Sequence, residues 1–197
     1  MDGRIDGVKR EDVPALEGIF QLVEGAMGFL PNSMLIMAKK PGLVEAFAGL
    51  GAVVNGPSAL APEIKRMAAF MASRAAGCRY CQAHTHHQAA ESGISAEKLD
   101  AIWDYERSDL FSGAERAALR VAQGAAQVPN AVGADDIAAL KVHFSEAEIV
   151  DLVAVIAFFG FLNRWNDTFA TALEADPAAH AEAHIAGHGW DIGKHAS

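Results

Sequence analysis

The chain has 197 residues, which is enough for a domain with a sizeable hydrophobic core. Hydrophobic residues make up 51% and charged residues 21% of it, a composition typical of globular rather than disordered proteins. The formal net charge of −9 argues against nucleic acid or an anionic membrane as a partner.

Residues 1–11 are polar and are expected to form an N-terminal arm. They contain no apolar stretch of the kind that a secretory signal has. The longest apolar run, 152–162, is far shorter than the roughly 20 residues that cross a bilayer. We therefore expect a cytoplasmic protein without a membrane segment.

The rest of the chain favours helices. Apolar residues recur every three or four positions, while prolines and Ser-x-x-Glu capping boxes mark helix starts. The expected helices are 13–25, 32–39, 42–54, one from 62, 77–93, one from about 95, one from about 113, 134–143, 146–173 and 178–186. No stretch shows the sustained alternation of a strand, so the predicted fold class is all-α.

Both cysteines of the chain, Cys78 and Cys81, belong to one expected helix. Cysteines three positions apart on a helix have Cα atoms roughly 5 Å apart, inside the disulfide range of about 4.4–6.8 Å. A bridge within the first turn is feasible but strained, and so easily reduced, which is typical of a working disulfide rather than a structural one. This pair therefore predicts redox chemistry.

Each thiol has a nearby group that favours the thiolate. Cys78 stands at the helix N-terminus, where unpaired N–H groups and the helix dipole stabilise negative charge. Cys81 is followed one turn later by His84 and Thr85, and His84 is the candidate base. His87 is instead expected to pair with Glu91.

Zinc at the cysteine helix is the rival hypothesis. Cys78, Cys81 and His84 are ligand types that zinc accepts, but one helix does not readily supply three converging ligands. The chain has no second cysteine pair to complete a tetrahedral set, so no metal is predicted there.

Two further polar groups stand out near the C-terminus. His180, His184 and His188 recur every four residues, a spacing that suits a metal, a subunit contact or a solvated face, although flanking glycines indicate that the helix ends before His188. A second group follows the apolar run and either lines the site or marks a helix surfacing into water: Asn163, Arg164, Asn166 and Asp167.

Residues 77–84, Gly-Cys-Arg-Tyr-Cys-Gln-Ala-His, followed by Gly-Ile-Ser at 93–95, resemble the alkylhydroperoxidase D-like/carboxymuconolactone decarboxylase family. The segment 161–167 resembles its peroxidase-related branch. The resemblance covers residues 28–175 of what we expect to be a single domain, 1–197, and leaves 176–197 as a C-terminal extension.

The resemblance implies an all-α fold that forms homo-oligomers, often trimers or hexamers, and a peroxidase cycle. Carried over, Cys81 attacks the peroxide, and Cys78 converts the resulting sulfenic acid to a disulfide before further oxidation. Such a cycle needs a peroxide and a dithiol protein or small thiol as reductant. It needs no organic cofactor and no metal.

Two positions depart from the family pattern. The family typically has a glutamate on the preceding helix where this chain has Arg66, and a histidine four residues after the second cysteine where this chain has Thr85. Glu63, one turn before Arg66, is the candidate substitute acid, and Arg66 is a candidate for lowering a thiol pKa by its charge.

The leading interpretation is a thiol-dependent peroxidase that reduces organic hydroperoxides or hydrogen peroxide, with His84 assisting proton transfer. Two alternatives stay open. One is a thiol–disulfide oxidoreductase or redox sensor without peroxide turnover, and the other is a non-catalytic, helical, oligomeric binding protein.

Overall fold

The computed structural model describes residues 4–196. Its α-helices are α1 (Glu17–Met27), α2 (Asn32–Met37), α3 (Leu43–Asn55), α4 (Pro62–Ala75), α5 (Arg79–Glu91), α6 (Ala96–Ala101), α7 (Gly113–Ala125), α8 (Ala134–His143), α9 (Glu146–Phe169) and α10 (Ala175–His184). Short 3₁₀ helices cover Arg10–Asp12, Pro14–Leu16, Ile102–Asp104, Ala186–His188 and Gly193–His195. Residues 4–196 contain no strand, which confirms the all-α prediction.

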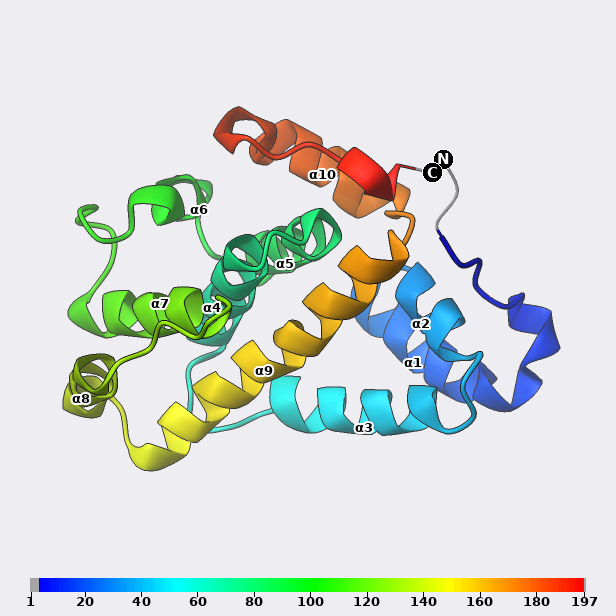
Figure 1. Cartoon of the computed structure of the whole chain (residues 1–197), viewed down its shortest axis with the longest axis horizontal. Helices are drawn as coiled ribbons and strands as arrows, with labels where there is room; N and C mark the ends of the chain where they lie inside the picture. Colours follow the sequence, from blue (N-terminus) through cyan, green and yellow to red (C-terminus); the bar gives the residue numbers. More distant parts are fainter. Residues whose placement is uncertain (1–3, 197) are drawn as a thin grey trace.

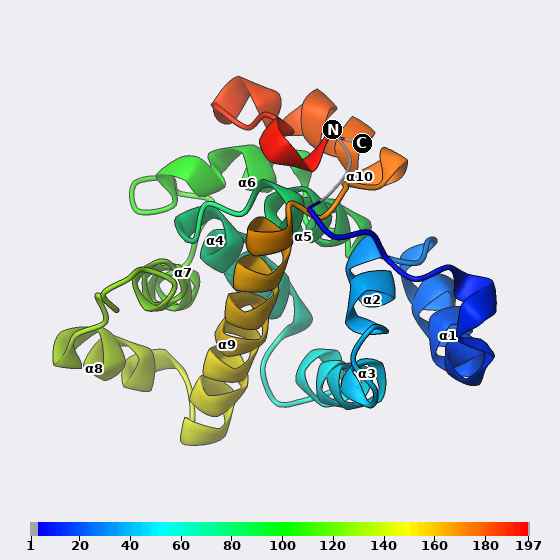
Figure 2. The same ribbon diagram turned by 45° about the vertical axis from the view of Figure 1, so that its right-hand side comes forward.

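Helix α9 runs diagonally through the molecule, with α1–α3 on one side and α6–α8 on the other (Figures 1 and 2). It contacts α3, α4, α5, α7 and α8, as expected for a largely apolar helix. Helix α4 packs closely on α5 and α7, and α10 lies over α5 (Figure 1). None of the helices between residues 4 and 196 is both long and apolar enough to cross a bilayer.

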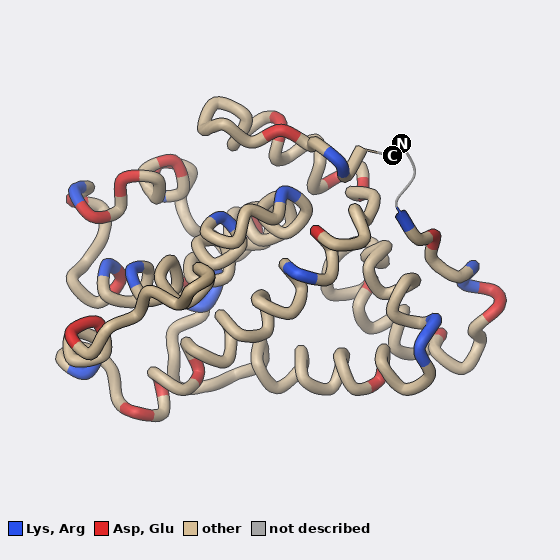
Figure 3. The backbone as a smooth tube through the Cα atoms, in the orientation of Figure 1, with Lys and Arg blue, Asp and Glu red and all other residues tan. Residues whose placement is uncertain are grey.

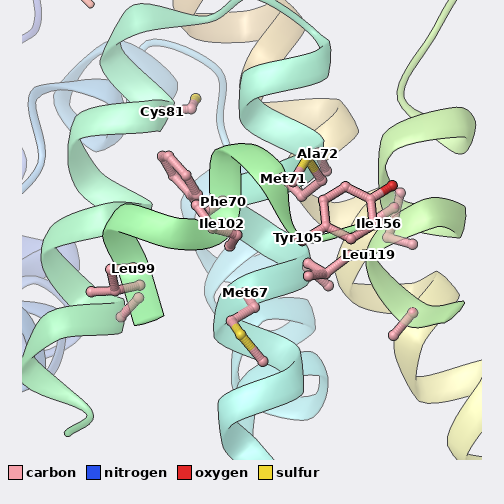
Figure 4. Close-up of a cluster of buried hydrophobic side chains, with 14 of the residues drawn as sticks. Met67, Phe70, Met71, Ala72, Cys81, Leu99, Ile102, Tyr105, Leu119 and Ile156 are labelled. Atoms are coloured by element: carbon pink, nitrogen blue, oxygen red, sulfur yellow. The ribbon is translucent and has the colours of Figure 1, made fainter. Parts of the chain in front are cut away.

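The largest hydrophobic cluster joins α4, α5, α7 and α9, and includes the buried side chains of Phe70, Met71 and Leu119. Figure 4 shows Cys81 at the edge of this cluster, with Phe70 between it and Met67 in that view. Charged residues of both signs occur along several helices and loops of the backbone in Figure 3 rather than in one stripe. Both cysteines thus lie in the packed interior.

Two helix starts that were predicted from capping boxes are confirmed. The side chains of Ser112 and Ser145 each accept a hydrogen bond from the backbone N–H of a glutamate three residues on, and the carboxylate of that glutamate accepts one from the serine N–H. These capping boxes begin α7 and α9 where the sequence predicts them.

Three predicted helix boundaries were wrong. A 3₁₀ turn at Pro14–Leu16 delays the first helix to Glu17. Helix α9 stops at Phe169 because Ala170 takes a left-handed conformation with φ 50°, so it does not reach residue 173. The last helix begins at Ala175 rather than at 178, because Pro177 is tolerated in its first turn, where a missing N–H leaves no helix bond unmade.

Lys65 is a buried cation that holds the turn between α3 and α4. Its Nζ donates hydrogen bonds of 2.9 Å to the carbonyl oxygens of Val54 and Gly56, at the end of α3. These carbonyls have no partner further along their own helix, so the ammonium takes the place of a C-cap. Because α3 forms part of the pocket described below, this contact also supports the site.

We expect Lys65→Met to lower the free energy of unfolding by about 1–3 kcal/mol, because it leaves buried carbonyls without a donor. Urea unfolding followed by circular dichroism measures the change. The matched control is Lys40→Met, since Lys40 is exposed and its loss should cost less than about 0.5 kcal/mol. Equal effects from the two substitutions would contradict this role for Lys65.

Candidate functional site

The junction between α4 and α5 places both cysteines. Gly77 has φ +77°, a conformation that L side chains rarely adopt, and it turns the chain from α4 into α5. Cys78 is then the N-cap of α5, and its sulfur accepts a hydrogen bond of 3.3 Å from the Cys81 N–H. The predicted position of Cys78 at the helix N-terminus is confirmed. Both thiols are free and buried.

Cys81 faces a pocket of about 550 Å³ between α1, α3, α5 and α9. Tyr80, His84 and Asn166 also line it. Most of the remaining wall is apolar, including Ile19, Val23, Met34, Phe47, Phe158 and Leu162. Cys81 therefore presents its sulfur to a space suited to a small apolar molecule.

The surroundings of Cys81 favour its neutral form. Burial raises the pKa of this thiol, and the neighbouring Cys78 raises it further. Asn166 acts in the opposite direction, because its side-chain amide donates to the Cys81 sulfur at 3.6 Å and so stabilises the thiolate. A base is consequently needed before Cys81 can attack.

His84 is anchored by a carboxylate that sequence reasoning missed. Its Nε2 lies 2.6 Å from Oε2 of Glu174, in the loop between α9 and α10. The other oxygen, Oε1, accepts hydrogen bonds from the Tyr80 hydroxyl at 2.8 Å and from the Asn32 N–H at 2.6 Å. With the Nε2 proton directed at Glu174, Nδ1 is the ring nitrogen left to accept a proton.

The charge of Glu174 depends on these donors. Burial opposes its ionisation, but the hydrogen bonds and charge of His84 and the donors of Asn32 and Tyr80 hold the pKa of the carboxyl below its ordinary value. The Tyr80 ring also stacks on the His84 imidazole, with centroids 4.3 Å apart. His84 is thus fixed in position beside an anionic partner.

The supporting residues proposed from the sequence lie elsewhere. Arg66 donates to Gln88 at 3.1 Å, and Glu63 is exposed and lines a different cavity, beside α6. Thr85 is buried and donates back to the Cys81 carbonyl oxygen at 2.6 Å, which is an ordinary bond within a helix. The carboxylate that contacts His84 is that of Glu174 rather than Glu63.

The C-terminal histidines meet α5 of the same chain. His180 Nε2 lies 2.9 Å from His86 Nδ1, and burial and the neighbouring imidazoles lower the pKa of both rings to about 4. His188 is outside the helix, as predicted, and stacks on Trp103. His180, His184 and His188 do not converge as a three-ligand set within the described residues. His87 pairs with Glu91 at 3.7 Å, as predicted.

Sequence reasoning found one residue of the polar group at 163–167 that reaches the pocket. Asn166 contacts the Cys81 sulfur, whereas Arg164 is exposed and bonds only to a carbonyl of its own helix. Glu174 gave no comparable signal, because it is a single acid 90 residues from His84 along the chain. Only the packing of the α9–α10 loop brings the two together.

Comparison with known proteins agrees with this geometry. The sequence model of the carboxymuconolactone decarboxylase family matches residues 41–124. Uncharacterized protein YnjA of Escherichia coli K12 is 30% identical over 124 residues, which is 63% of this chain and 67% of that protein. The chain belongs to the carboxymuconolactone decarboxylase family.

Two solved structures show how widely the fold is shared. The debrominase Bmp8, in a Cys-to-Ala variant bound to 2,3,4-tribromopyrrole, is 35% identical with a TM-score of 0.85, covering 91% of this chain and 96% of that one. A peroxidase-related protein from Ralstonia eutropha JMP134, with the alkylhydroperoxidase AhpD core, is 22% identical with a TM-score of 0.79, covering 90% and 95%. The resemblance predicted from residues 77–95 is confirmed.

We expect Glu174→Gln to destabilise the protein by about 1–3 kcal/mol at neutral pH, because an amide N–H would then face the donors that the carboxylate satisfies. The carboxyl pKa is lowered on folding, so its stabilisation is complete above the ordinary value of 4.5 and is lost as the pH falls through the lower folded value. The difference from wild type should therefore shrink in acid.

Urea unfolding across the acidic range measures this effect. The matched control is Glu182→Gln on the exposed side of α10, which should leave the pH dependence unchanged. A constant difference between wild type and Glu174→Gln at every pH would contradict ionisation of Glu174 in the folded state.

Proposed function

We propose that this protein is a thiol-dependent peroxidase that reduces organic hydroperoxides with the Cys78–Cys81 pair. The observation that carries the proposal is the position of Cys81, whose sulfur lines the apolar pocket while Cys78 lies one turn behind it. The apolar walls favour an organic hydroperoxide over hydrogen peroxide, which offers no surface for them to bind.

The chemistry divides between the two sulfurs. The Cys81 thiolate attacks the terminal peroxide oxygen, an S–O bond forms, and the O–O bond breaks. His84 has first taken the proton of the Cys81 thiol, and it then gives that proton to the departing alkoxide, so that an alcohol leaves. Cys78 then attacks the Cys81 sulfenic acid, which forms the disulfide and releases water. An external dithiol returns the pair to its reduced state.

A second candidate is reductive dehalogenation of a small haloaromatic compound. The likeness to the debrominase Bmp8 favours it, since that protein binds 2,3,4-tribromopyrrole and shares 35% identity over 91% of this chain. In this reaction the Cys81 thiolate attacks the halogen, and His84 protonates the ring carbon. Cys78 next displaces halide from Cys81 to form the disulfide. In both reactions the cysteine pair supplies two electrons. The reactions differ in whether the Cys81 thiolate attacks a peroxide oxygen or a halogen.

Cysteine variants should separate the roles of the sulfurs. We expect Cys81→Ser to abolish reduction of cumene hydroperoxide. Cys78→Ser should permit a single attack and leave sulfenic acid on Cys81, because no resolving thiol remains. Stopped-flow peroxide consumption and mass spectrometry of the dimedone-trapped cysteine peptides measure both results. In wild type, sub-stoichiometric peroxide should produce the Cys78–Cys81 disulfide.

The same reduced protein is given 2,3,4-tribromopyrrole in a parallel reaction, with bromide release as the readout. Bromide without peroxide turnover would replace the first candidate by the second. Thiols that survive both compounds but exchange with disulfides would overturn both and leave the oxidoreductase alternative.

His84→Asn should slow hydroperoxide reduction by about 10²–10⁴-fold, because the alkoxide then leaves without a positioned acid. The same variant should lose less of its rate with dithiodipyridine, whose leaving group is stable without a proton, because His84 then only takes the proton of Cys81. His87→Asn is the control, since His87 pairs with Glu91 away from the pocket. An equal loss with both reagents would show that His84 acts on Cys81 rather than on the leaving group.

A further inference from the structure

A second group of ionisable side chains lies behind the cysteine pair. Among the described residues, donor atoms of Cys78, Asp167 and His195 lie within 4.8 Å of one another. Cys78 comes from the N-cap of α5, Asp167 from the last turn of α9, and His195 from the 3₁₀ helix Gly193–His195. Cys81 lines the pocket, whereas this group lies beside the other sulfur of the pair, that of Cys78.

His195 is held in one orientation by the backbone. Its Nδ1 lies 2.8 Å from the Thr171 carbonyl oxygen, and because a carbonyl only accepts, Nδ1 must carry the proton. The neutral ring then has its lone pair on Nε2, which is buried and has no hydrogen-bond partner within residues 4–196. Nε2 lies 3.8 Å from Oδ1 of Asp167. A buried, unpartnered acceptor of this kind calls for an explanation.

Burial favours the neutral form of His195, and its neighbours leave the ring able to accept a proton. Burial lowers the pKa of the imidazole, whereas its bond to Thr171 and the carboxylate of Asp167 work against that decrease. Lys194 Nζ lies 2.8 Å from the other oxygen of Asp167 and balances its charge. Tyr80 packs nearby, its ring centroid 5.9 Å from that of His195.

We propose that His195 is the general base for Cys78, the sulfur of the pair that does not line the pocket, with Asp167 as the positioning residue that stabilises the resulting imidazolium. The inference rests on the proposed redox cycle of Cys78 and Cys81 and adds the group that drives its second step. Ligand atoms of Cys78 and His195 lie within 4.8 Å of each other, and catalytic hydrogen bonds are often long in unliganded structures and shorten during reaction.

Closure of the disulfide begins with a proton transfer. Nε2 of His195 takes the proton from the Cys78 sulfur, and the thiolate attacks the sulfur of oxidised Cys81. An S–S bond forms and the bond from Cys81 to its leaving group breaks. When that group is hydroxide, the imidazolium returns the proton and water departs. His84 and His195 thus act at different sulfurs of the pair. His84 transfers the proton at Cys81 and the substrate, and His195 takes the proton of the resolving thiol, Cys78.

Dithiodipyridine tests the proposal without any peroxide or haloaromatic compound. Attack by Cys81 releases one thiopyridone, and ring closure by Cys78 releases a second, so the two absorbance phases report the two sulfurs separately. His195→Asn keeps an amide donor near the position of Nδ1 for Thr171 but has no group at Nε2. We expect the first phase to change by less than about twofold and the second to slow by about 100-fold.

The pH profile distinguishes a base from a structural role. In wild type the second phase should level off once His195 is neutral, whereas in His195→Asn it should keep rising as the pH increases, because no buried base then takes the proton. Asp167→Asn should move the wild-type midpoint to lower pH, because the carboxylate raises the pKa of the imidazole. His188→Asn, in the same C-terminal segment, is the control and should change neither phase.

An unchanged second phase in folded His195→Asn overturns the proposal. If that variant does not fold, an unmoved midpoint in Asp167→Asn overturns it instead. Failure of the proposed function looks different: wild type then closes its disulfide rapidly with dithiodipyridine, His195→Asn closes it slowly, and neither cumene hydroperoxide nor 2,3,4-tribromopyrrole is reduced. That result leaves the assignment of His195 supported.

Discussion

The buried start of α5 is the constraint on which the rest of the site depends. A helix that begins inside the protein must find partners for its first N–H groups, and here the Cys78 sulfur supplies one. Gly77 permits the turn that places this sulfur at the cap. One turn then separates two sulfurs that face different surroundings: Cys81 meets an apolar pocket, and Cys78 meets ionisable side chains.

The C-terminal segment supplies partners on both sides of the pair. Glu174, just before α10, fixes His84 at the pocket, and His195 lies behind Cys78. From the sequence, residues 176–197 look like an extension outside the family-like core. In the structure this segment packs on α5, and the backbone of His195 accepts a hydrogen bond from the Leu173 N–H. Its contribution to the site follows from that packing.

Local chemistry made much of the fold predictable. Capping boxes, prolines and the spacing of apolar residues depend on neighbours within one or two turns, so α7, α8 and the Cys helix were located closely. The end of α9 was not, because Ala170 adopts a left-handed conformation that no glycine announces. A left-handed turn can be predicted from sequence only when it falls on a residue that favours positive φ, such as glycine.

The site was predictable to the same extent. Cys78, Cys81 and His84 share one helix, and their spacing alone brings them together. Glu174 reaches His84 through the packing of a loop 90 residues away, and nothing near either residue reports that contact. Arg66 and Glu63 were chosen by their position on the preceding helix, but the face they occupy is turned toward Gln88 and α6.

The use of a cysteine as a helix cap ties the backbone to the oxidation state of the pair. In the proposed cycle this capping sulfur joins a disulfide, so the group that accepts from the Cys81 N–H changes with each turnover. Both sulfurs are buried, and any reducing thiol must approach one of them in line with the S–S bond. The pocket reaches the Cys81 sulfur and is not lined by Cys78, so in the proposed cycle the reducing thiol would arrive by the same route as the substrate.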